Sequence, residues 1–360
     1  MKRVYNFSAG PSVLPLKVLE DAQTDLVSYK NAGMSVMEMS HRSADYSIII
    51  NEAKADFKEL LNIPDNYEVL FLQGGASTQF SMVPMNIGLK GKAQYVNTGV
   101  WSKKAIAEAN KMGIDVDVIA SSADKTFSYI PKIDDSMIDT DADYFFITSN
   151  NTIFGTSFST LPDTKGVPVV ADMSSDILSK PINVEDYGII FAGAQKNMGP
   201  AGLTVVIVRK DLIGKASDSV PTMMNYSTHA DNDSMFNTPP TYSIYMAGLV
   251  FKWLKELGGL KAIQKINEEK AAILYDYLDS TEFYTTPVVK DDRSLMNVTF
   301  VCANVELNDG FVKGAKEKDL VNLKGHRLVG GMRASIYNAM PIDGVKALVD
   351  YMKEFEKANK

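Results

Sequence analysis

The chain has 360 residues, a formal net charge of −7 at pH 7 and a single cysteine, Cys302. The acidic balance excludes a dedicated nucleic-acid surface, which would carry a basic bias. One cysteine excludes an internal disulfide framework and a cysteine-based zinc cluster. No apolar run approaches the roughly 20 residues of a membrane span, and no apolar segment of signal-peptide length follows the N-terminus. We therefore expect a cytoplasmic protein, with no metal ligands among its site residues.

Short apolar runs alternate with helical patterns from about residue 69 to 208. This alternation is typical of βαβ units and predicts an α/β fold with a mostly parallel sheet. Helices are predicted between the runs over 78–87 and 103–112. The predicted strands are 69–72, 94–97, 115–119, 144–148, 167–171, 188–191 and 204–208.

A polar stretch from 217 to 241 comes next. It is too long for an ordinary connection, so we expect it to be either functional or flexible. Amphipathic helices are predicted over 242–257 and 260–278, with a boundary between two units near 258–280. The remaining patterns predict a compact α+β unit made of the segments 297–301, 310–318, 332–336 and 344–355.

A lysine and an aspartate follow two neighbouring predicted strands. Lys196 lies in a loop of small residues after strand 188–191, and Asp172 follows strand 167–171. Open α/β sheets bind ligands at such strand ends. A pyridoxal phosphate enzyme needs a lysine amine for covalent attachment and an acid to hold the pyridinium nitrogen. Alone, the lysine would be read as solvated and Asp172 as a helix cap, but the combination favours the cofactor site.

Two further features lie at the same side of the predicted sheet. The segment 73–78 follows a strand and opens a helix, so its N–H groups and hydroxyls form a potential phosphate cradle. The glycines that a βα turn needs explain this segment equally well. Trp101 begins the helix after strand 94–97, where it either packs in the core or stacks on a flat cofactor.

Cationic residues form three more candidate sites. His41 with Arg42 and His326 with Arg327 are pairs in polar segments, for which a solvated surface is the simplest interpretation. Arg333 differs, because it lies in an apolar strand pattern, where an unpaired guanidinium is costly. Arginine recognises carboxylates and phosphates bidentately. Together these residues fit a substrate with a carboxylate at one end and a dianion at the other.

Six runs of the sequence resemble the phosphoserine aminotransferase family, a branch of the class V aminotransferases. They are Asn6–Pro11, Ser40–Arg42, Ala171–Leu178, Ala192–Asn197, Asn237–Pro240 and Gly325–Arg327. The resemblance implies the type I pyridoxal phosphate-dependent transferase fold. A large cofactor-binding domain, residues 16–258, would surround a mainly parallel seven-stranded sheet, and residues 1–15 with 259–360 would form a smaller α+β domain. It also implies a homodimer with shared active sites.

The resemblance further implies a role for each candidate residue. Lys196 would bind the cofactor and act as general base, Asp172 would hold its pyridinium nitrogen, and Arg333 would bind the substrate α-carboxylate. The other cofactor contacts would be Ala76, Ser77, Trp101, Thr152 and Gln195, with Asn237 and Thr238 from the partner subunit. The phosphate of phosphoserine or the distal carboxylate of glutamate would lie among His41, Arg42, His326 and Arg327. Ser77 stands where some relatives carry arginine, which would leave the cofactor phosphate with one cation fewer.

The implied reaction is transamination between L-phosphoserine and 2-oxoglutarate, giving 3-phosphohydroxypyruvate and L-glutamate in serine biosynthesis. The same anion sites would also suit 4-phosphohydroxy-L-threonine, a substrate of pyridoxine (vitamin B6) biosynthesis.

Three alternative functions were considered besides phosphoserine transamination. A cysteine desulfurase needs a mobile cysteine, whereas Cys302 closes a strand-like run and is expected to be buried. An aminotransferase for alanine, or for serine and glyoxylate, would have no use for two His-Arg pairs. A cofactor-binding protein without catalysis would be expected to have lost Lys196 or Asp172, and both are present.

Overall fold

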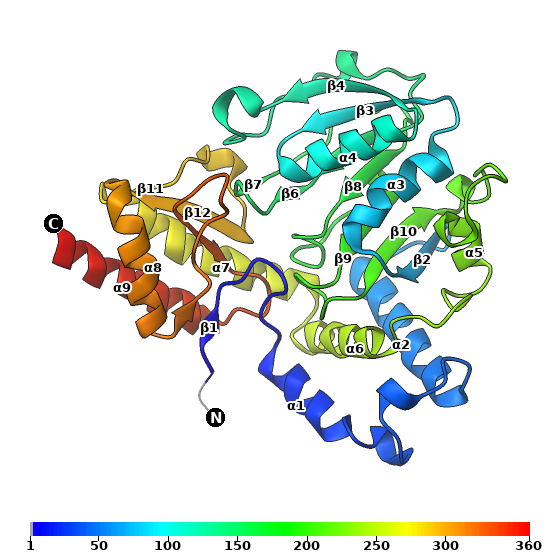
Figure 1. The fold of residues 1–360 in the computed structure, drawn as a ribbon, viewed down its shortest axis with the longest axis horizontal. Coiled ribbons are helices and arrows are strands. Elements are labelled where there is room, and N and C mark those ends of the chain that lie inside the picture. The colour runs from blue at the N-terminus through cyan, green and yellow to red at the C-terminus, as the bar shows by residue number, and fades with distance from the viewer. Residues whose placement is uncertain (1–2) are drawn as a thin grey trace.

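A seven-stranded sheet forms the centre of the larger part of the molecule (Figure 1). In the computed structural model, which describes residues 3–360, the strand order is β2-β10-β9-β8-β5-β3-β4. β10 (Thr204–Arg209) is antiparallel to both of its neighbours, and the other neighbouring pairs are parallel. The other strands are β2 (Tyr67–Leu72), β3 (Lys92–Asn97), β4 (Asp115–Ser121), β5 (Phe145–Thr148), β8 (Val169–Asp172) and β9 (Ile189–Gly193). The predicted α/β class and mainly parallel sheet are confirmed, and every predicted strand overlaps one of these.

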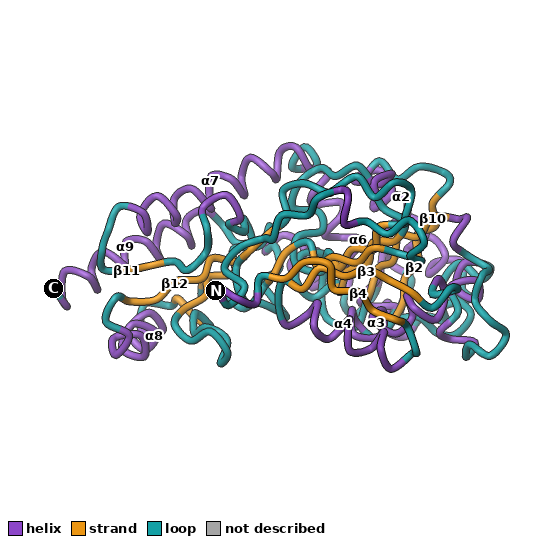
Figure 2. The backbone as a smooth tube through the Cα atoms, turned by 90° about the horizontal axis from the view of Figure 1, so that it is seen from above, coloured by secondary structure: helices purple, strands orange, loops and turns teal. Residues whose placement is uncertain are grey.

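Helices cover both faces of the sheet (Figure 2). Successive strand residues point to opposite faces, so Val69 belongs to one layer of buried side chains and Leu70 to the other. The layer of Leu70 includes α3 (Gly75–Ile87), α4 (Val100–Lys111) and α5 (Tyr226–Ala230). The layer of Val69 includes α1 (Leu16–Asp25), α2 (Ala44–Leu61) and α6 (Thr241–Glu256). Within residues 3–360 no helix combines the length and the apolar character needed to cross a membrane.

The sequence reading missed α1 and α2. In α2 a usable signal was present, because its buried residues Tyr46, Ile49, Ala53 and Phe57 recur at helical spacing. The Ser43 hydroxyl accepts the main-chain N–H of Tyr46 at 3.2 Å and caps the start of the helix. This helix packs lengthwise on α6 and closes one face of the sheet.

The polar stretch 217–241 packs against the sheet. His229 is buried in α5, and its Nε2 atom lies 2.9 Å from the Met223 carbonyl oxygen. The Ser234 hydroxyl accepts the main-chain N–H of Phe71, in β2, at 2.9 Å. The end of the stretch, with Asn237 and Thr238, is exposed immediately before α6.

A second, smaller group of elements lies beside the first (Figure 1). Its three-stranded sheet has the order β11-β12-β14, and β1 pairs with β13, which ties the N-terminal segment to this part. A separate cluster of buried side chains fills it, including Phe7, Phe300 and Phe311. Its elements are β1 (Tyr5–Asn6), β11 (Tyr284–Thr285), β12 (Asn297–Cys302), α8 (Asn308–Glu317), β13 (Leu320–Val321), β14 (Met332–Ser335) and α9 (Ile342–Asn359). This separate cluster agrees with a division into residues 16–258 and residues 1–15 with 259–360. The domain boundaries themselves stay a prediction.

The helix α7 (Leu260–Asp279) connects the two clusters of buried side chains. Leu260 belongs to the first cluster and Leu274 to the second. Between them Lys270 is fully buried, and its amine donates to the carbonyl oxygens of Ile336 at 2.9 Å and Tyr337 at 2.7 Å. No carboxylate forms an ion pair with Lys270 in the described part of the chain. Burial lowers the pKa of Lys270 to about 7.

We expect this lysine to make stability depend on pH. In the unfolded chain a lysine keeps its proton up to a pH of about 10.4, whereas folded Lys270 loses it near pH 7. The unfolded state therefore binds more protons between these values, and the free energy of unfolding should rise with pH by up to about 1.4 kcal/mol per unit. Urea unfolding of the wild-type protein and Lys270→Met at pH 7, 8 and 9 should show a steeper rise in the wild type, since Lys196, whose pKa is also lowered, contributes to both profiles. Parallel pH profiles would contradict the prediction.

Candidate active site

Lys196 lies just beyond β9, in a loop covered by the N-terminal segment. The Ser12 main-chain N–H donates to the Gln195 carbonyl oxygen at 2.9 Å, and the Ser12 hydroxyl donates to the Lys196 carbonyl oxygen. A Cβ atom at Gly10 would lie 3.3 Å from Lys196 Cγ and 3.6 Å from Gln195 Cγ. The segment Gly10–Ser12 thus holds the base of the lysine side chain against the sheet.

The Lys196 amine points toward groups from two other strand ends. Its Nζ atom donates to the Thr152 hydroxyl at 2.7 Å and lies 5.6 Å from the centroid of the Trp101 ring. Burial lowers the pKa of Lys196 to about 8; the Asp172 carboxylate opposes this shift and the Arg333 charge adds to it. An amine with this pKa is partly neutral at neutral pH, which is the form that acts as a nucleophile or base.

Asp172 is the last residue of β8, and its side chain is buried. Its Oδ1 atom accepts the main-chain N–H of Ser174 at 3.0 Å, which is a local turn contact of the kind expected from a cap. Burial raises the pKa of Asp172, and the Lys196 charge partly offsets this. Within residues 3–360 no lysine or arginine forms an ion pair with it, so the carboxylate has capacity for a further cation.

Ala76 and Ser77 lie in the first turn of α3. The helix starts after Gly74, whose φ of +94° suits glycine, and no side chain caps it. A Cβ atom at Gly74 would lie 2.1 Å from Thr78 Oγ1. The N–H groups of the first turn have no partners within the helix, so they are available to an anion.

Arg333 lies in β14, and its guanidinium faces the Lys196 loop. Nη1 donates to the Thr152 carbonyl oxygen at 3.4 Å, and Nε is buried without a hydrogen-bond partner in the described part of the chain. Burial lowers the pKa of Arg333. The group is therefore a cation with an unused donor in the described part of the chain, and its role as an anion-binding residue stays a prediction.

The two His-Arg pairs differ in how the fold places them. The charges of Arg333, Arg327 and Lys104 all lower the pKa of His326, after the larger effect of burial, so His326 and Arg327 belong with Arg333. No hydrogen bond or ion pair in residues 3–360 joins either His-Arg pair to Lys196, Asp172 or Arg333, and no such effect on the pKa of His326 comes from His41 or Arg42. Asn237 and Thr238 likewise have no hydrogen bond to Lys196, Asp172 or Arg333 in residues 3–360.

Sequence reasoning missed a set of buried amides that holds these elements together. The Asn150 side-chain N–H donates to Asn297 Oδ1 at 2.8 Å, and the Asn297 amide donates to the Tyr337 hydroxyl at 3.2 Å. That hydroxyl donates to the Ala9 carbonyl oxygen at 2.7 Å. The network joins the chain before Thr152, the small sheet and the N-terminal segment. Its only sequence signal was an asparagine inside an otherwise apolar strand pattern.

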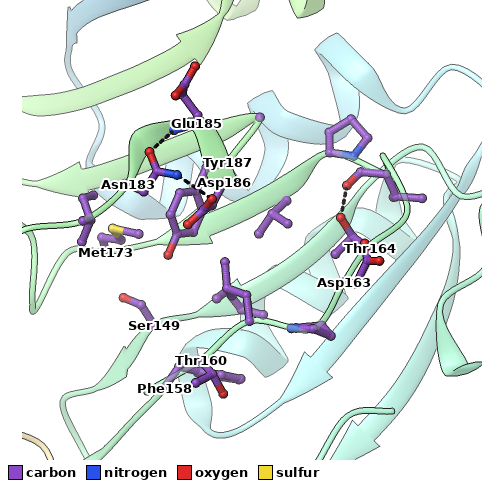
Figure 3. Close-up of a pocket in the computed structure, with 18 of the residues that line it drawn as sticks. Ser149, Phe158, Thr160, Asp163, Thr164, Met173, Asn183, Glu185, Asp186 and Tyr187 are labelled. Atoms are coloured by element: carbon purple, nitrogen blue, oxygen red, sulfur yellow. Dashed lines mark hydrogen bonds between the residues drawn. The ribbon is translucent and has the colours of Figure 1, made fainter. Parts of the chain in front are cut away.

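A cavity of about 730 Å³ lies beside Met173, the residue that follows β8 (Figure 3). Phe158, Met173 and Tyr187 line it, and Lys196 does not. Ser149 connects this cavity with the site, because its hydroxyl donates to the Asp172 carbonyl oxygen at 3.1 Å and to Asp176 Oδ1 at 2.5 Å. The cavity thus borders the rear of the strand that carries Asp172, and the Lys196 amine faces another space.

We expect the Lys196 amine to titrate near pH 8 in the protein without a cofactor. Acetylation by acetic anhydride from pH 6 to 10, followed by peptide mass spectrometry, reports this midpoint because only the neutral amine reacts. Exposed Lys17 is an internal reference, since its hydrogen bond to Asp21 raises its pKa, and its reactivity should still be rising at pH 10. The same pH profile for the two lysines would show that burial does not lower the pKa of Lys196.

Known proteins resemble the chain over its full length. Residues 4–348 match the model of the aminotransferase class-V family. A phosphoserine aminotransferase from Bacillus cereus is 57% identical over 361 residues, covering 100% of both chains. The solved structure of phosphoserine aminotransferase from Bacillus circulans subsp. alkalophilus is 49% identical, with a TM-score of 0.97 and 100% of both chains covered. A pyridoxal phosphate-bound phosphoserine aminotransferase from Trichomonas vaginalis is 40% identical, with a TM-score of 0.93 over 98% of this chain and 100% of that one. With a seven-stranded, mainly parallel sheet that overlays these enzymes, this chain belongs to the phosphoserine aminotransferase family of class V aminotransferases.

Proposed function

We propose that this chain catalyses reversible transfer of an amino group between L-phosphoserine and 2-oxoglutarate, giving 3-phosphohydroxypyruvate and L-glutamate, with pyridoxal 5'-phosphate as its cofactor. The observation that carries the proposal is the buried Lys196 amine, which has a lowered pKa and lies at the same sheet edge as Asp172. Identity of 57% to a phosphoserine aminotransferase supports the choice of substrate. When bound, pyridoxal phosphate supplies a sink for the electrons left on the substrate Cα atom.

The described residues fit this cofactor. The buried Asp172 carboxylate has no ion pair with lysine or arginine in residues 3–360, and it would hold the pyridinium N–H. The first turn of α3, with Ala76 and Ser77, would bind the phosphate group through its free N–H groups. Contacts to the ring and the phosphate would be completed by Trp101, Thr152 and Gln195.

Lys196 would have two roles. Its amine would hold the cofactor covalently, and after displacement by the substrate amine it would take the proton from the substrate Cα atom. The Thr152 hydroxyl, 2.7 Å from Nζ, would orient the amine. The lowered pKa, to about 8, lets this amine accept a proton near neutral pH.

The cationic groups would bind the substrate at its two ends. Arg333 would hold the α-carboxylate, because its Nε donor is buried and unused in the described part of the chain. His326 and Arg327 would bind the phosphate of phosphoserine or the distal carboxylate of glutamate, together with His41 and Arg42.

We also propose a cytoplasmic homodimer with shared active sites. The exposure of Arg42, Asn237 and Thr238 supports this assembly, because in a dimer these residues would be free to reach the partner's cofactor or substrate. The same cations would accept 4-phosphohydroxy-L-threonine, one carbon longer than phosphoserine, which adds a role in pyridoxine biosynthesis to the proposal.

The structure counts against the cysteine desulfurase alternative. Cys302 is fully buried at the end of β12, and its main-chain N–H donates to Asn308 Oδ1 at 2.9 Å. Burial raises the pKa of its thiol to about 11. A buried, protonated thiol on a strand lacks the mobility and the charge of a reactive nucleophile.

The absorption spectrum of the purified protein tests cofactor and substrate together. We expect the band of the bound cofactor to change when L-phosphoserine is added and to return with 2-oxoglutarate. Lys196→Ala should lose turnover by about 10⁴-fold or more, since it removes the base and the covalent link. Its circular dichroism should match the wild type. If the cofactor band is present but does not change with phosphoserine, the cofactor assignment holds and the substrate assignment is wrong. Retained turnover in Lys196→Ala would show that Lys196 is not the base.

Substitution of the arginines tests the distal anion site. We expect Arg42→Ala and Arg327→Ala each to raise the KM for L-phosphoserine about tenfold or more. A hydrogen bond between charged groups contributes about 1.5–3 kcal/mol, and 1.4 kcal/mol corresponds to a factor of ten. Steady-state kinetics measure this effect. Unchanged kinetics in both variants would place the anion site elsewhere.

A further inference from the structure

We propose that Lys104 is a further substrate-recognition residue, which favours a phosphate over a carboxylate at the distal end of the substrate. The inference rests on the proposed function and adds to it a residue outside the motifs that carry the family resemblance. Its basis is the position of an unpaired ammonium group beside the Trp101 ring and the His326 loop.

Lys104 lies next to the ring that borders the Lys196 amine. Its Nζ atom is 4.6 Å from the centroid of the Trp101 ring, and Lys196 Nζ is 5.6 Å from the same centroid. Both lysines therefore contact one indole group, although one belongs to α4 and the other follows β9. A cation over an indole face keeps its full charge and is held in place.

The loop that carries His326 and Arg327 comes close to α4. Leu328 of this loop lines a cavity of about 460 Å³ together with Lys103 and Lys104 of α4 and with Phe127 and Phe154. The charge of Lys104 acts on the His326 ring together with those of Arg327 and Arg333. Lys104 thus extends the cationic group of the small domain onto the large one.

No acidic side chain neutralises Lys104. Within residues 3–360 it forms no ion pair, whereas Lys111 on the same helix pairs with Glu108 at 2.7 Å. The positive charges of Lys104, Arg327 and Arg333 all lower the pKa of the His326 ring, which is a repulsion between like charges. An anionic ligand relieves this repulsion, and the relief grows with the ligand's charge.

The two amino donors differ in that charge. A phosphate monoester carries about −1.5 to −2 at pH 7, whereas a side-chain carboxylate carries −1. The Lys104 ammonium therefore attracts phosphoserine more strongly than glutamate. Since Lys104 is exposed, salt screens this attraction, with a Debye length of about 8 Å at physiological ionic strength.

The test compares Lys104→Gln with a matched control, Lys103→Gln. Lys103 has the same charge on the same helix and lines the same cavity, but its Nζ atom lies over Phe127, 4.8 Å from that ring centroid, and not over Trp101. Unlike Lys104, it does not contribute to the lowered pKa of His326. Each variant, loaded with cofactor, is mixed with L-phosphoserine alone or L-glutamate alone, and the half-reaction is followed by cofactor absorbance. We expect Lys104→Gln to lower the phosphoserine-to-glutamate ratio of kcat/KM about threefold to tenfold, with little change in the maximal rate. The ratio should change less than about twofold in Lys103→Gln, and Lys104→Arg should restore it.

The outcomes separate the inference from the proposed function. The effect of Lys104→Gln should shrink when the salt concentration is raised from 20 to 500 mM. An equal loss for both donors would reveal a role through Trp101 and overturn the inference, as would equal ratios in Lys104→Gln and Lys103→Gln. A wild-type enzyme that does not react with phosphoserine would refute the proposed function itself.

Discussion

A buried amine is tolerated at a strand end only if polar groups from several segments surround it, and this constraint organises the structure around Lys196. Burial disfavours the charged form, which is why the pKa of Lys196 falls to about 8. The Thr152 hydroxyl and the Asp172 carboxylate limit that cost. These residues follow or end neighbouring strands β5, β8 and β9, whose parallel pairing brings their carboxyl ends to one edge. The sheet order therefore decides which side chains meet.

The smaller group of elements is attached to this edge by neutral hydrogen bonds. Asn150, Asn297 and Tyr337 connect it to the sheet and to the N-terminal segment, and all three are buried. A buried amide without a hydrogen-bond partner costs free energy, so each amide of the network must keep its partner. The network therefore specifies one arrangement of the two parts. Its amides do not titrate, and the joint therefore adds no charge to those of the site. Arg333 reaches the Lys196 loop as a consequence of this joint.

Unpaired charge is the second property of this edge. Arg333 has an unused buried donor, and Asp172 has no ion pair with lysine or arginine among the described residues. Such groups destabilise a folded chain on their own and are relieved when a ligand of opposite charge binds. Elsewhere in the described part of the molecule, some exposed lysines pair with acids, as in Lys111–Glu108 and Lys255–Asp56, and others do not. What marks the site physically is that Arg333 and Asp172 are buried and still lack an ion pair among the described residues.

Local sequence patterns predicted the sheet and the lysine–aspartate pair, through apolar runs of strand length and the residue types at their ends. The family followed from the resemblance of six runs of the sequence to known enzymes. Both α1 and α2 were missed, although the helical spacing of the buried residues of α2 could have been recognised. Nor did the sequence reveal the Asn150–Asn297–Tyr337 network or the place of Lys104 beside the His326 loop. The residues of these contacts are far apart in the chain, and they meet only when the smaller group of elements packs on the larger one. Such contacts have no periodicity to read, because the packing of the two parts creates them. For the same reason only the packing of the chain showed that the charge of Arg333 acts on Lys196, whereas His41 and Arg42 form no hydrogen bond or ion pair with that lysine in residues 3–360.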